Sequence, residues 1–166
     1  MNKQLIEDKA RYKEQKMPLF QKYYRKLQEK SILRPIYKIL FMVCKKMYMI
    51  EMSEHTQIGG GLYLGHARLI TINPSAVIGK NCNIHKGVTI GQENRGKRKG
   101  CPTIGNNVWI GINSTIVGKV NIGDDVLIAP NSYVNCDVPS HSVCFGNPII
   151  IKPKENATEQ YINNTI

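Results

Sequence analysis

From Gln57 onward an aliphatic residue recurs at every sixth position, and no other feature of the sequence restricts the fold as strongly. The register runs in three stretches: Ile58, Leu64 and Ile70; Ile72, Ile78, Ile84 and Ile90; and Ile104, Ile110, Ile116, Ile122, Ile128 and Val134. Neither a helix nor an alternating strand has this period. A prism of short strands does, because each face places one aliphatic side chain inward before a tight corner. The sequence predicts a mainly β, hexapeptide-repeat solenoid with three faces per coil.

Residues 92–103, QENRGKRKGCPT, interrupt this repeat. They contain no inward aliphatic residue, and the register resumes two residues out of phase. We therefore expect a loop extruded from the solenoid, which is a common place for function on a rigid scaffold. Its cations Arg95, Lys97 and Arg98 are candidates for binding an anionic acceptor or phosphates by charge-assisted bonds. A merely solvated surface loop is the alternative.

The first fifty residues differ from the rest of the chain in composition and charge. Residues 1–50 contain 13 Lys and Arg against 4 Asp and Glu, so they hold +9 of the net +11. They contain no glycine, and Pro18 and Pro35 divide them into three expected short helices. In the third helix Ile36, Ile39, Leu40 and Val43 recur at helical spacing; we expect them to face the core. The alternative is a helix lying on an anionic membrane.

The predicted organisation has three parts: a basic helical segment at 1–50, a β-helix at 51–153 with the loop 92–103, and a polar, loose tail at 154–166. The five cysteines are odd in number, lack C-x-x-C spacing and follow no secretion signal. We therefore expect a reduced, cytoplasmic protein whose basic helices can touch the inner face of the membrane. No nucleic-acid-binding motif is present, so that class of partner is not expected.

The hexads, the extruded loop and the ending V-P-S-x-S-V-x-x-G-x-P at 138–148 together resemble the hexapeptide-repeat acyltransferases over residues 51–153. Within that group, residues 51–66 and 87–91 look like the serine acetyltransferase branch. Cys-Pro-Thr-Ile-Gly at 101–105 is most similar to the short O-acetyltransferases of colanic-acid and capsule clusters. The resemblance implies a left-handed parallel β-helix, acetyl-CoA as co-substrate, and a homotrimer with sites between subunits.

The same resemblance implies a catalytic dyad. An acid and a histidine lie fifteen residues apart in the serine acetyltransferases, and the matching positions here hold Glu51 and His66. A hydroxyl is a weak nucleophile, so His66 is the candidate general base. Glu51 would fix its tautomer and stabilise the imidazolium. A purely structural histidine is the alternative.

Several residues are candidates for acetyl-CoA. A backbone N–H at Gly91 or Gly111 would stabilise the tetrahedral oxyanion, and the residues alone do not choose between them. Asn113 and Asn131 fall on the coils that line the pantetheine arm in this family, and Lys119 and Lys152 are candidate phosphate contacts. Solvated lysines are the alternative for both cations.

The acceptor is predicted from two departures. Serine acetyltransferases bind the serine carboxylate with an Arg-His pair before the proline that ends the loop, where this chain has Gly100-Cys101. Its helical segment is also much shorter than theirs. We therefore expect transfer to a sugar hydroxyl in exopolysaccharide or capsule synthesis, with serine as the alternative acceptor. His85, nineteen residues after His66, is expected near the same cleft, or in a structural role. Cys101 is a possible acyl carrier, although direct transfer is usual in this fold.

Two other classes were weighed. The same solenoid hosts zinc carbonic anhydrases, but His55, His66, His85 and His141 lack zinc-site spacing, so no metal is predicted. A non-catalytic binding scaffold is the second class, and it would make His66 and Glu51 dispensable.

Overall fold

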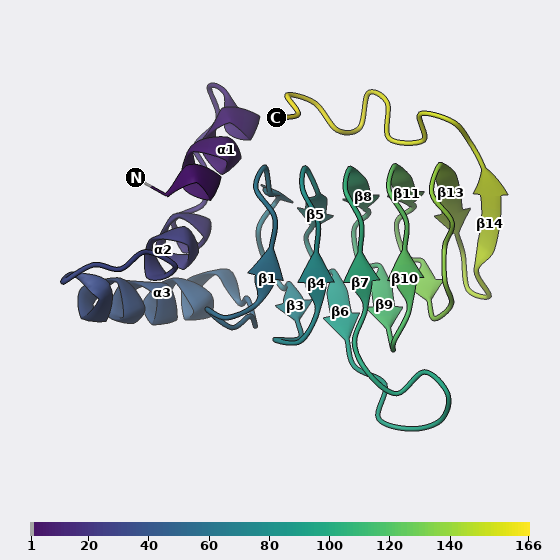
Figure 1. Cartoon of the computed structure of the whole chain (residues 1–166), viewed down its shortest axis with the longest axis horizontal. Coiled ribbons are helices and arrows are strands. Elements are labelled where there is room, and N and C mark those ends of the chain that lie inside the picture. The colour runs from purple at the N-terminus through teal and green to yellow at the C-terminus, as the bar shows by residue number, and fades with distance from the viewer. Residues whose placement is uncertain (1) are drawn as a thin grey trace.

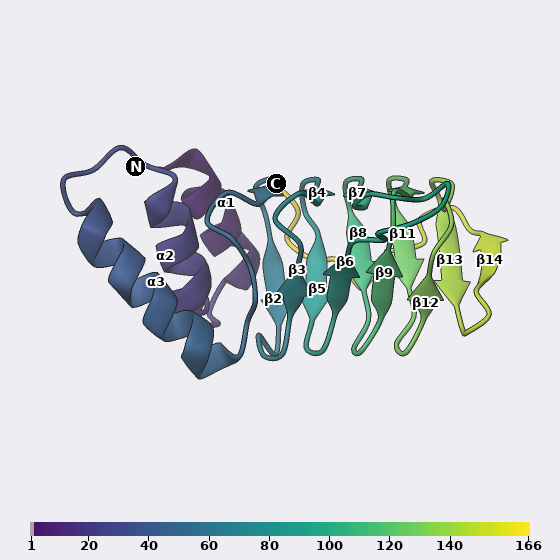
Figure 2. The same ribbon diagram turned by 90° about the horizontal axis from the view of Figure 1, so that it is seen from below.

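The computed structural model describes residues 2–166 and shows a parallel β-solenoid of about five coils with three helices at its N-terminal end (Figures 1 and 2). The mainly β, three-faced architecture predicted from the period of six is confirmed. Its hexapeptide repeat fits the left-handed β-helix.

Each face of the prism is one sheet. Face 1 consists of β1 (Gln57–Ile58), β4 (Val77–Ile78), β7 (Thr103–Ile104) and β10 (Asn121–Ile122). Face 2 consists of β2 (Tyr63–Gly65), β5 (Asn83–His85), β8 (Val108–Ile110), β11 (Val126–Ile128), β13 (Ser142–Phe145) and the antiparallel β14 (Ile150–Pro153). Face 3 consists of β3 (Thr71–Ile72), β6 (Thr89–Gly91), β9 (Thr115–Val117) and β12 (Tyr133–Val134).

The inward aliphatic residues stack in register from coil to coil. On face 1 the stack is Ile58, Ile78, Ile104 and Ile122, all at most 4% exposed. Successive members are twenty, twenty-six and eighteen residues apart, so the first two coils hold more residues than the third. The small surplus of the first coil lies at the corner after β2, and that of the second is the loop.

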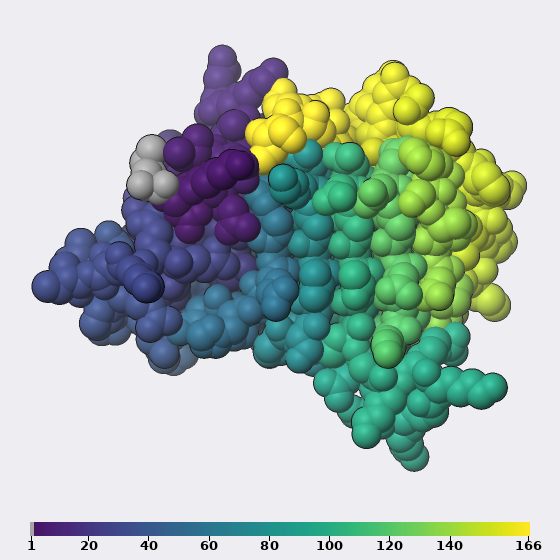
Figure 3. All heavy atoms as spheres, viewed as in Figure 1, coloured from purple at the N-terminus to yellow at the C-terminus, as the bar shows by residue number. Residues whose placement is uncertain are grey.

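The loop 92–103 leaves the prism between β6 and β7, as predicted, and projects from it in Figures 1 and 3. Glu93 and Gly100 close its base, each donating its N–H to the other's carbonyl at 3.0 Å. Behind the base, the N–H of Lys119 donates to the carbonyl of Arg98 at 2.8 Å. These bonds fix the direction in which the loop leaves the solenoid.

The predicted three helices are present as α1 (Lys3–Tyr12), α2 (Leu19–Leu27) and α3 (Arg34–Tyr48). The side chain of Asn2 caps α1, accepting from the N–H of Leu5 at 3.2 Å. Pro18 precedes α2, and a proline in the first turn begins α3. The rings of Phe20 and Phe41 stack at 5.1 Å and join α2 to α3.

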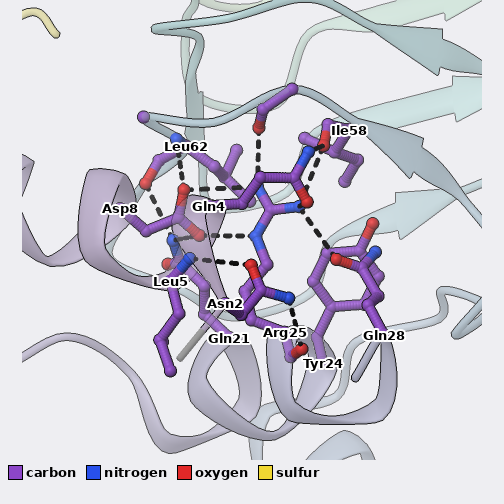
Figure 4. A network of polar contacts seen from close by, with 12 residues as sticks. Asn2, Gln4, Leu5, Asp8, Gln21, Tyr24, Arg25, Gln28, Ile58 and Leu62 are labelled. Carbon is purple, nitrogen blue, oxygen red and sulfur yellow. Dashed lines mark hydrogen bonds and ion pairs between the residues drawn. The ribbon is translucent and has the colours of Figure 1, made fainter. Parts of the chain in front are cut away.

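A fully buried ion pair fastens α1 and α2 to the first coil (Figure 4). Arg25 donates from Nε to Oδ2 of Asp8 at 2.8 Å, and neither side chain is exposed. The other oxygen of Asp8 accepts from the N–H of Leu62 at 2.9 Å. Arg25 also donates to the carbonyls of Ile58 and Gly59. Because solenoid atoms complete the hydrogen bonds of both ions, the pair sets how the helices sit on the prism.

The predicted orientation of α3 is wrong. Ile36, Ile39 and Val43 are about half exposed or more, at 54%, 63% and 48%, whereas Phe41 and Cys44 from another side of the helix are buried. The side of α3 that carries Phe41 is buried because α3 packs on the aromatic residues of α2 rather than on the aliphatic stack of the solenoid. Within residues 2–166, no helix is long and apolar enough to cross a bilayer.

The expectation of a loose C-terminal tail is also wrong. Residues 154–166 run back along the solenoid toward α1, as the yellow trace in Figure 1 shows. Asp125 holds this segment by accepting from the N–H of Thr158 and from its hydroxyl, at 2.9 and 2.7 Å. At its far end Arg11 donates to the carbonyl of Asn163 at 2.8 Å. Backbone groups of this segment, together with the Thr158 hydroxyl, thus satisfy side chains of the solenoid and of α1.

Replacing Arg25 tests the anchoring role of the buried pair. Arg25→Leu should lower the free energy of unfolding by about 3–5 kcal/mol, because it leaves the Asp8 carboxylate buried without its partner. The double variant Asp8→Leu/Arg25→Leu should be less destabilised than this single variant. Urea unfolding followed by circular dichroism measures both. Lys3→Ala, which breaks an exposed pair with Glu7, is the control expected to change little. Equal effects of Arg25→Leu and Lys3→Ala would contradict the anchoring role.

Candidate active site

His66 stands at the corner where the first coil turns from face 2 to face 3. It directly follows β2 and has a left-handed backbone, with φ of 54°. Its exposed side chain lines a cavity of about 1010 Å³, here named the His66 cavity. The wall consists of Tyr12, residues 15–19 between α1 and α2, Tyr48, residues 63–68, His85, Lys86 and Ile112. At this corner the imidazole lies outside the sheets and is accessible from solvent, as a residue that contacts substrates must be.

His85 lies in the same cavity, one coil above, which is the alternative that its spacing left open beside a structural role. Its ring packs over Gly65, where a Cβ would collide with it, and lies 4.7 Å from the ring of Trp109. Its Nε2 is buried and has no hydrogen-bond partner among residues 2–166. Burial, and secondarily the nearby His66, lower the pKa of His85. It therefore enters the site as a neutral imidazole.

Three cations that the sequence reading missed also line the His66 cavity: Lys16, Arg68 and Lys86. Arg68 and Lys86 are exposed side chains close in sequence to His66 and His85. Because they lie close in sequence to the two histidines, the sequence could have predicted them as site residues. The sequence gives no such indication for Lys16, because only the packing of α1 and α2 on the solenoid brings residues 15–19 to the site. The three charges make the cavity suited to a small anionic acceptor.

Within residues 2–166, no hydrogen bond or ion pair joins Glu51 to His66. Glu51 starts face 3, where its backbone pairs with Thr71, and its side chain lines two smaller cavities instead. One of these, about 450 Å³ in volume, also includes Gly91. Glu51 and Gly91 thus line the same cavity, and the catalytic dyad stays a prediction.

The corner that begins at His66 continues through every coil as one edge, here called the His66 edge. Gly87, Asn113 and Asn131 occupy it with left-handed backbones, and the N–H of Asn131 donates to the carbonyl of Ile112. At about 4.8 Å per coil, the edge extends about 14 Å from His66 to Asn131. The two asparagines predicted to contact the pantetheine arm are therefore equivalent positions on the edge that begins at His66.

The two glycines proposed as oxyanion donors differ in their surroundings. The N–H of Gly111 donates to the carbonyl of Ile128 at 2.8 Å, so it is committed to the ladder. A Cβ at Gly111 would also lie 2.6 Å from the backbone nitrogen of Pro130, so close coil packing requires glycine there. Gly91 borders a cavity and is half-buried. It is paired with Val117 in face 3 and does not line the His66 cavity, so the choice between the two glycines stays a prediction.

The remaining predicted site residues lie elsewhere on this chain. Arg95, Lys97 and Arg98 are exposed on the loop, at the opposite edge of face 3 from His66. Cys101 and Lys119 lie at the loop base, and burial raises the pKa of the Cys101 thiol, which disfavours the thiolate that an acyl carrier needs. Lys152 lies on β14, its Nζ 5.9 Å from the centre of the Phe145 ring.

The four histidines that raised the zinc alternative are spread over the molecule. His55 lies 3.7 Å from Glu54, and His141 bonds Asp125 at 3.0 Å near the C-terminal segment. In the part of the chain that the structure describes, no group of three or more His, Cys, Asp or Glu could hold a metal ion.

Comparison of this chain with known proteins shows which proteins it is similar to. Residues 101–136 match the model of the bacterial transferase hexapeptide (six repeats). A serine acetyltransferase of Helicobacter pylori is 36% identical over 98 residues, which cover 59% of this chain and 57% of that protein. Residues 101–136 thus carry the hexapeptide repeat of bacterial transferases, and the chain is homologous to the serine acetyltransferases.

Two solved structures extend the likeness. Serine acetyltransferase of Neisseria gonorrhoeae in complex with serine has a TM-score of 0.70 and 27% identity, covering 90% of this chain and 68% of that one. Serine acetyltransferase of Brucella abortus in complex with coenzyme A has a TM-score of 0.65 and 26% identity, covering 74% and 49%. The chain spans about half the length of the curated relatives that it matches.

These comparisons overturn the predicted sugar acceptor and the role in polysaccharide synthesis. The relatives, at 31–37% identity, and the solved structures are serine acetyltransferases, which favours serine, the alternative. The prediction rested on Gly100-Cys101 replacing an Arg-His pair and on the short helical segment. It was wrong because cations can enter a site from other elements, as Lys16, Arg68 and Lys86 do in the His66 cavity.

The burial of His85 has a measurable consequence. Its imidazole should titrate below the ordinary pKa of 6.5, and His66→Gln should raise that pKa only part of the way, because burial is the larger cause. Its contribution to stability is therefore fully present above pH 6.5 and is lost as the pH falls through the lowered pKa. Titration of the ring protons by NMR measures this. A His85 that titrates at or above its ordinary pKa would contradict the assignment.

Proposed function

We propose that this chain is a serine O-acetyltransferase that transfers the acetyl group of acetyl-CoA to the hydroxyl of L-serine. The observation that carries the proposal is the His66 cavity, in which an exposed corner imidazole is surrounded by three cations. Homology to serine acetyltransferases, with solved complexes of serine and of coenzyme A among them, supports both substrates.

In the proposed reaction His66 accepts the hydroxyl proton as the serine oxygen attacks the thioester carbonyl. The tetrahedral intermediate collapses, the C–S bond breaks, and the imidazolium returns its proton to the departing coenzyme A thiolate. O-acetylserine and coenzyme A are the products. Such base assistance accelerates transfer by about 10²–10⁴-fold. Glu51 remains the proposed orienting carboxylate, although it does not contact His66 within one chain.

Arg68 and Lys86 are the proposed partners of the serine carboxylate. They project from the corners of the first two coils into the cavity that holds both histidines. This position replaces the Arg-His pair, which the loop of this chain lacks. The neutral His85, with its buried unpartnered Nε2, is available to hydrogen-bond the same small acceptor.

Acetyl-CoA is proposed to lie along the His66 edge, past Asn113 and Asn131. We propose a homotrimer, because in a cyclic assembly of prisms the His66 edge of one copy faces the loop edge of the next. Arg95, Lys97 and Arg98 would then reach the coenzyme phosphates from a neighbouring copy. This arrangement explains why one chain keeps its loop cations and His66 at opposite edges of face 3.

Release of thiol from acetyl-CoA in the presence of L-serine tests the activity. The parent protein should show serine-dependent release, and His66→Ala should lower kcat by about 10²–10⁴-fold through loss of the base. Glu51→Gln should lower it less. Circular dichroism confirms that the variants fold. Serine-dependent release that is indifferent to His66, or no release above background by the parent, would sink the proposal.

Arg68→Gln tests the carboxylate site. Loss of one charge-assisted hydrogen bond should raise KM for L-serine about tenfold while kcat stays close to that of the parent. Steady-state kinetics at varied serine separates the two constants. Lys80→Gln, an exposed lysine outside the cavity, is the matched control. An Arg68→Gln enzyme with unchanged KM would show that the carboxylate binds elsewhere.

A further inference from the structure

α3 and the turn before it expose an unusual amount of apolar surface. Five large side chains follow one another at spacings of four, three, four and four residues, so they form a single stripe along the helix. They are Ile32, Ile36, Ile39, Val43 and Met47, exposed by 95%, 54%, 63%, 48% and 62%. Met42 and Met49 are also more than half exposed. Scattered apolar residues are ordinary on a surface, but a continuous stripe marks a surface that binds something.

The charge around this stripe is of one sign. Residues 30–50 contain five Lys and Arg and no Asp or Glu. Arg34 and Lys38 reach one carboxylate, that of Glu54 on the following segment. Lys30, Lys45 and Lys46 have no carboxylate within 4.0 Å among residues 2–166. The surface thus combines apolar side chains with uncompensated positive charge.

The stripe is held in place from its other side. Phe41 and Cys44 bury α3 against α2, so the helix is formed and oriented without any partner. Figures 1 and 2 place α3 at the end of the molecule away from β14. Because the helix is already formed, binding through it costs little conformational entropy, and this lowers the free-energy cost of association.

We propose that α3 binds an anionic lipid surface, lying along it with the stripe of Ile32, Ile36, Ile39, Val43 and Met47 in the headgroup and acyl boundary. Basic amphipathic helices with a broad apolar face bind membranes in this way, and each nearby Lys or Arg adds about 1 kcal/mol on anionic lipid. Charge decides against a second copy as occupant. Two stripes packed together would bring together two segments, residues 30–50 of each copy, that carry five cations each and no acid.

This inference goes beyond the proposed acetyl transfer and does not depend on it. The two are linked only by position, because Tyr48 at the end of α3 lines the His66 cavity. A protein bound through α3 would carry out its chemistry close to the membrane surface. The binding test below measures no activity, so either proposal can fail alone.

Cosedimentation of the full chain with vesicles tests the proposal. The protein should sediment with phosphatidylcholine vesicles that contain phosphatidylserine, sediment little with pure phosphatidylcholine, and be released in part by raised salt. Ile36→Gln/Val43→Gln should weaken partitioning by about tenfold or more, because two apolar side chains are lost from the buried face. Ile150→Gln/Ile166→Gln, which changes two side chains of similar exposure, 50% and 46%, should bind like the parent.

The outcomes are distinct. Loss of binding in the α3 variant alone supports the proposal. Binding unaffected by the α3 changes, or no binding to vesicles of either composition, overturns it. Light scattering of the same variants tests a second copy of the chain as the alternative partner. If the α3 variant differs from the parent in oligomer size and the parent does not bind vesicles, the stripe joins copies of the chain, which also overturns the proposal. Circular dichroism and thermal melting show that the compared variants are equally folded.

Discussion

Everything in this molecule depends on stacking one aliphatic side chain per face per coil. The prism is too narrow to hold more, so Ile58, Ile78, Ile104 and Ile122 must lie directly above one another and point inward. Once they do, the backbone between them has no freedom except at the corners. Side chains that follow an inward residue by a fixed number of positions therefore form straight edges. Asn113 and Asn131, each three residues after an inward isoleucine, form such an edge at the corner where His66, two residues after Leu64, also lies.

A prism alone has edges but few enclosed spaces, and the helices supply the enclosure. The Asp8–Arg25 pair holds α1 and α2 against the carbonyls and N–H groups of the first coil. That attachment brings residues 15–19 over the corner of His66. A buried pair costs desolvation energy, so its value lies in specifying one arrangement of helices on the solenoid. Here that arrangement creates the cavity in which the proposed chemistry occurs.

In the proposed function, recognition of the acceptor carboxylate has moved from one element of the fold to others. The family pattern puts cations for the acceptor carboxylate at the end of the loop, and this chain has Gly100-Cys101 there. Arg68 and Lys86 are instead corner residues of the first two coils. Binding of an anion depends on the charge and geometry of the groups around it, and it does not depend on which segment of the chain supplies those groups. Absence of one motif was therefore a poor guide to the acceptor, whereas homology over the whole solenoid was a better one.

The sequence by itself determined the solenoid, its faces, the extruded loop and the three helices, because a period of six and the positions of Pro18 and Pro35 are local signals with few structural solutions. It also placed His66 and His85 near each other through the coil length. Tertiary structure decided which side of α3 is buried, how residues 154–166 pack, and that Lys16 meets His66. Each of these depends on contacts between segments distant in the chain, which no local period encodes.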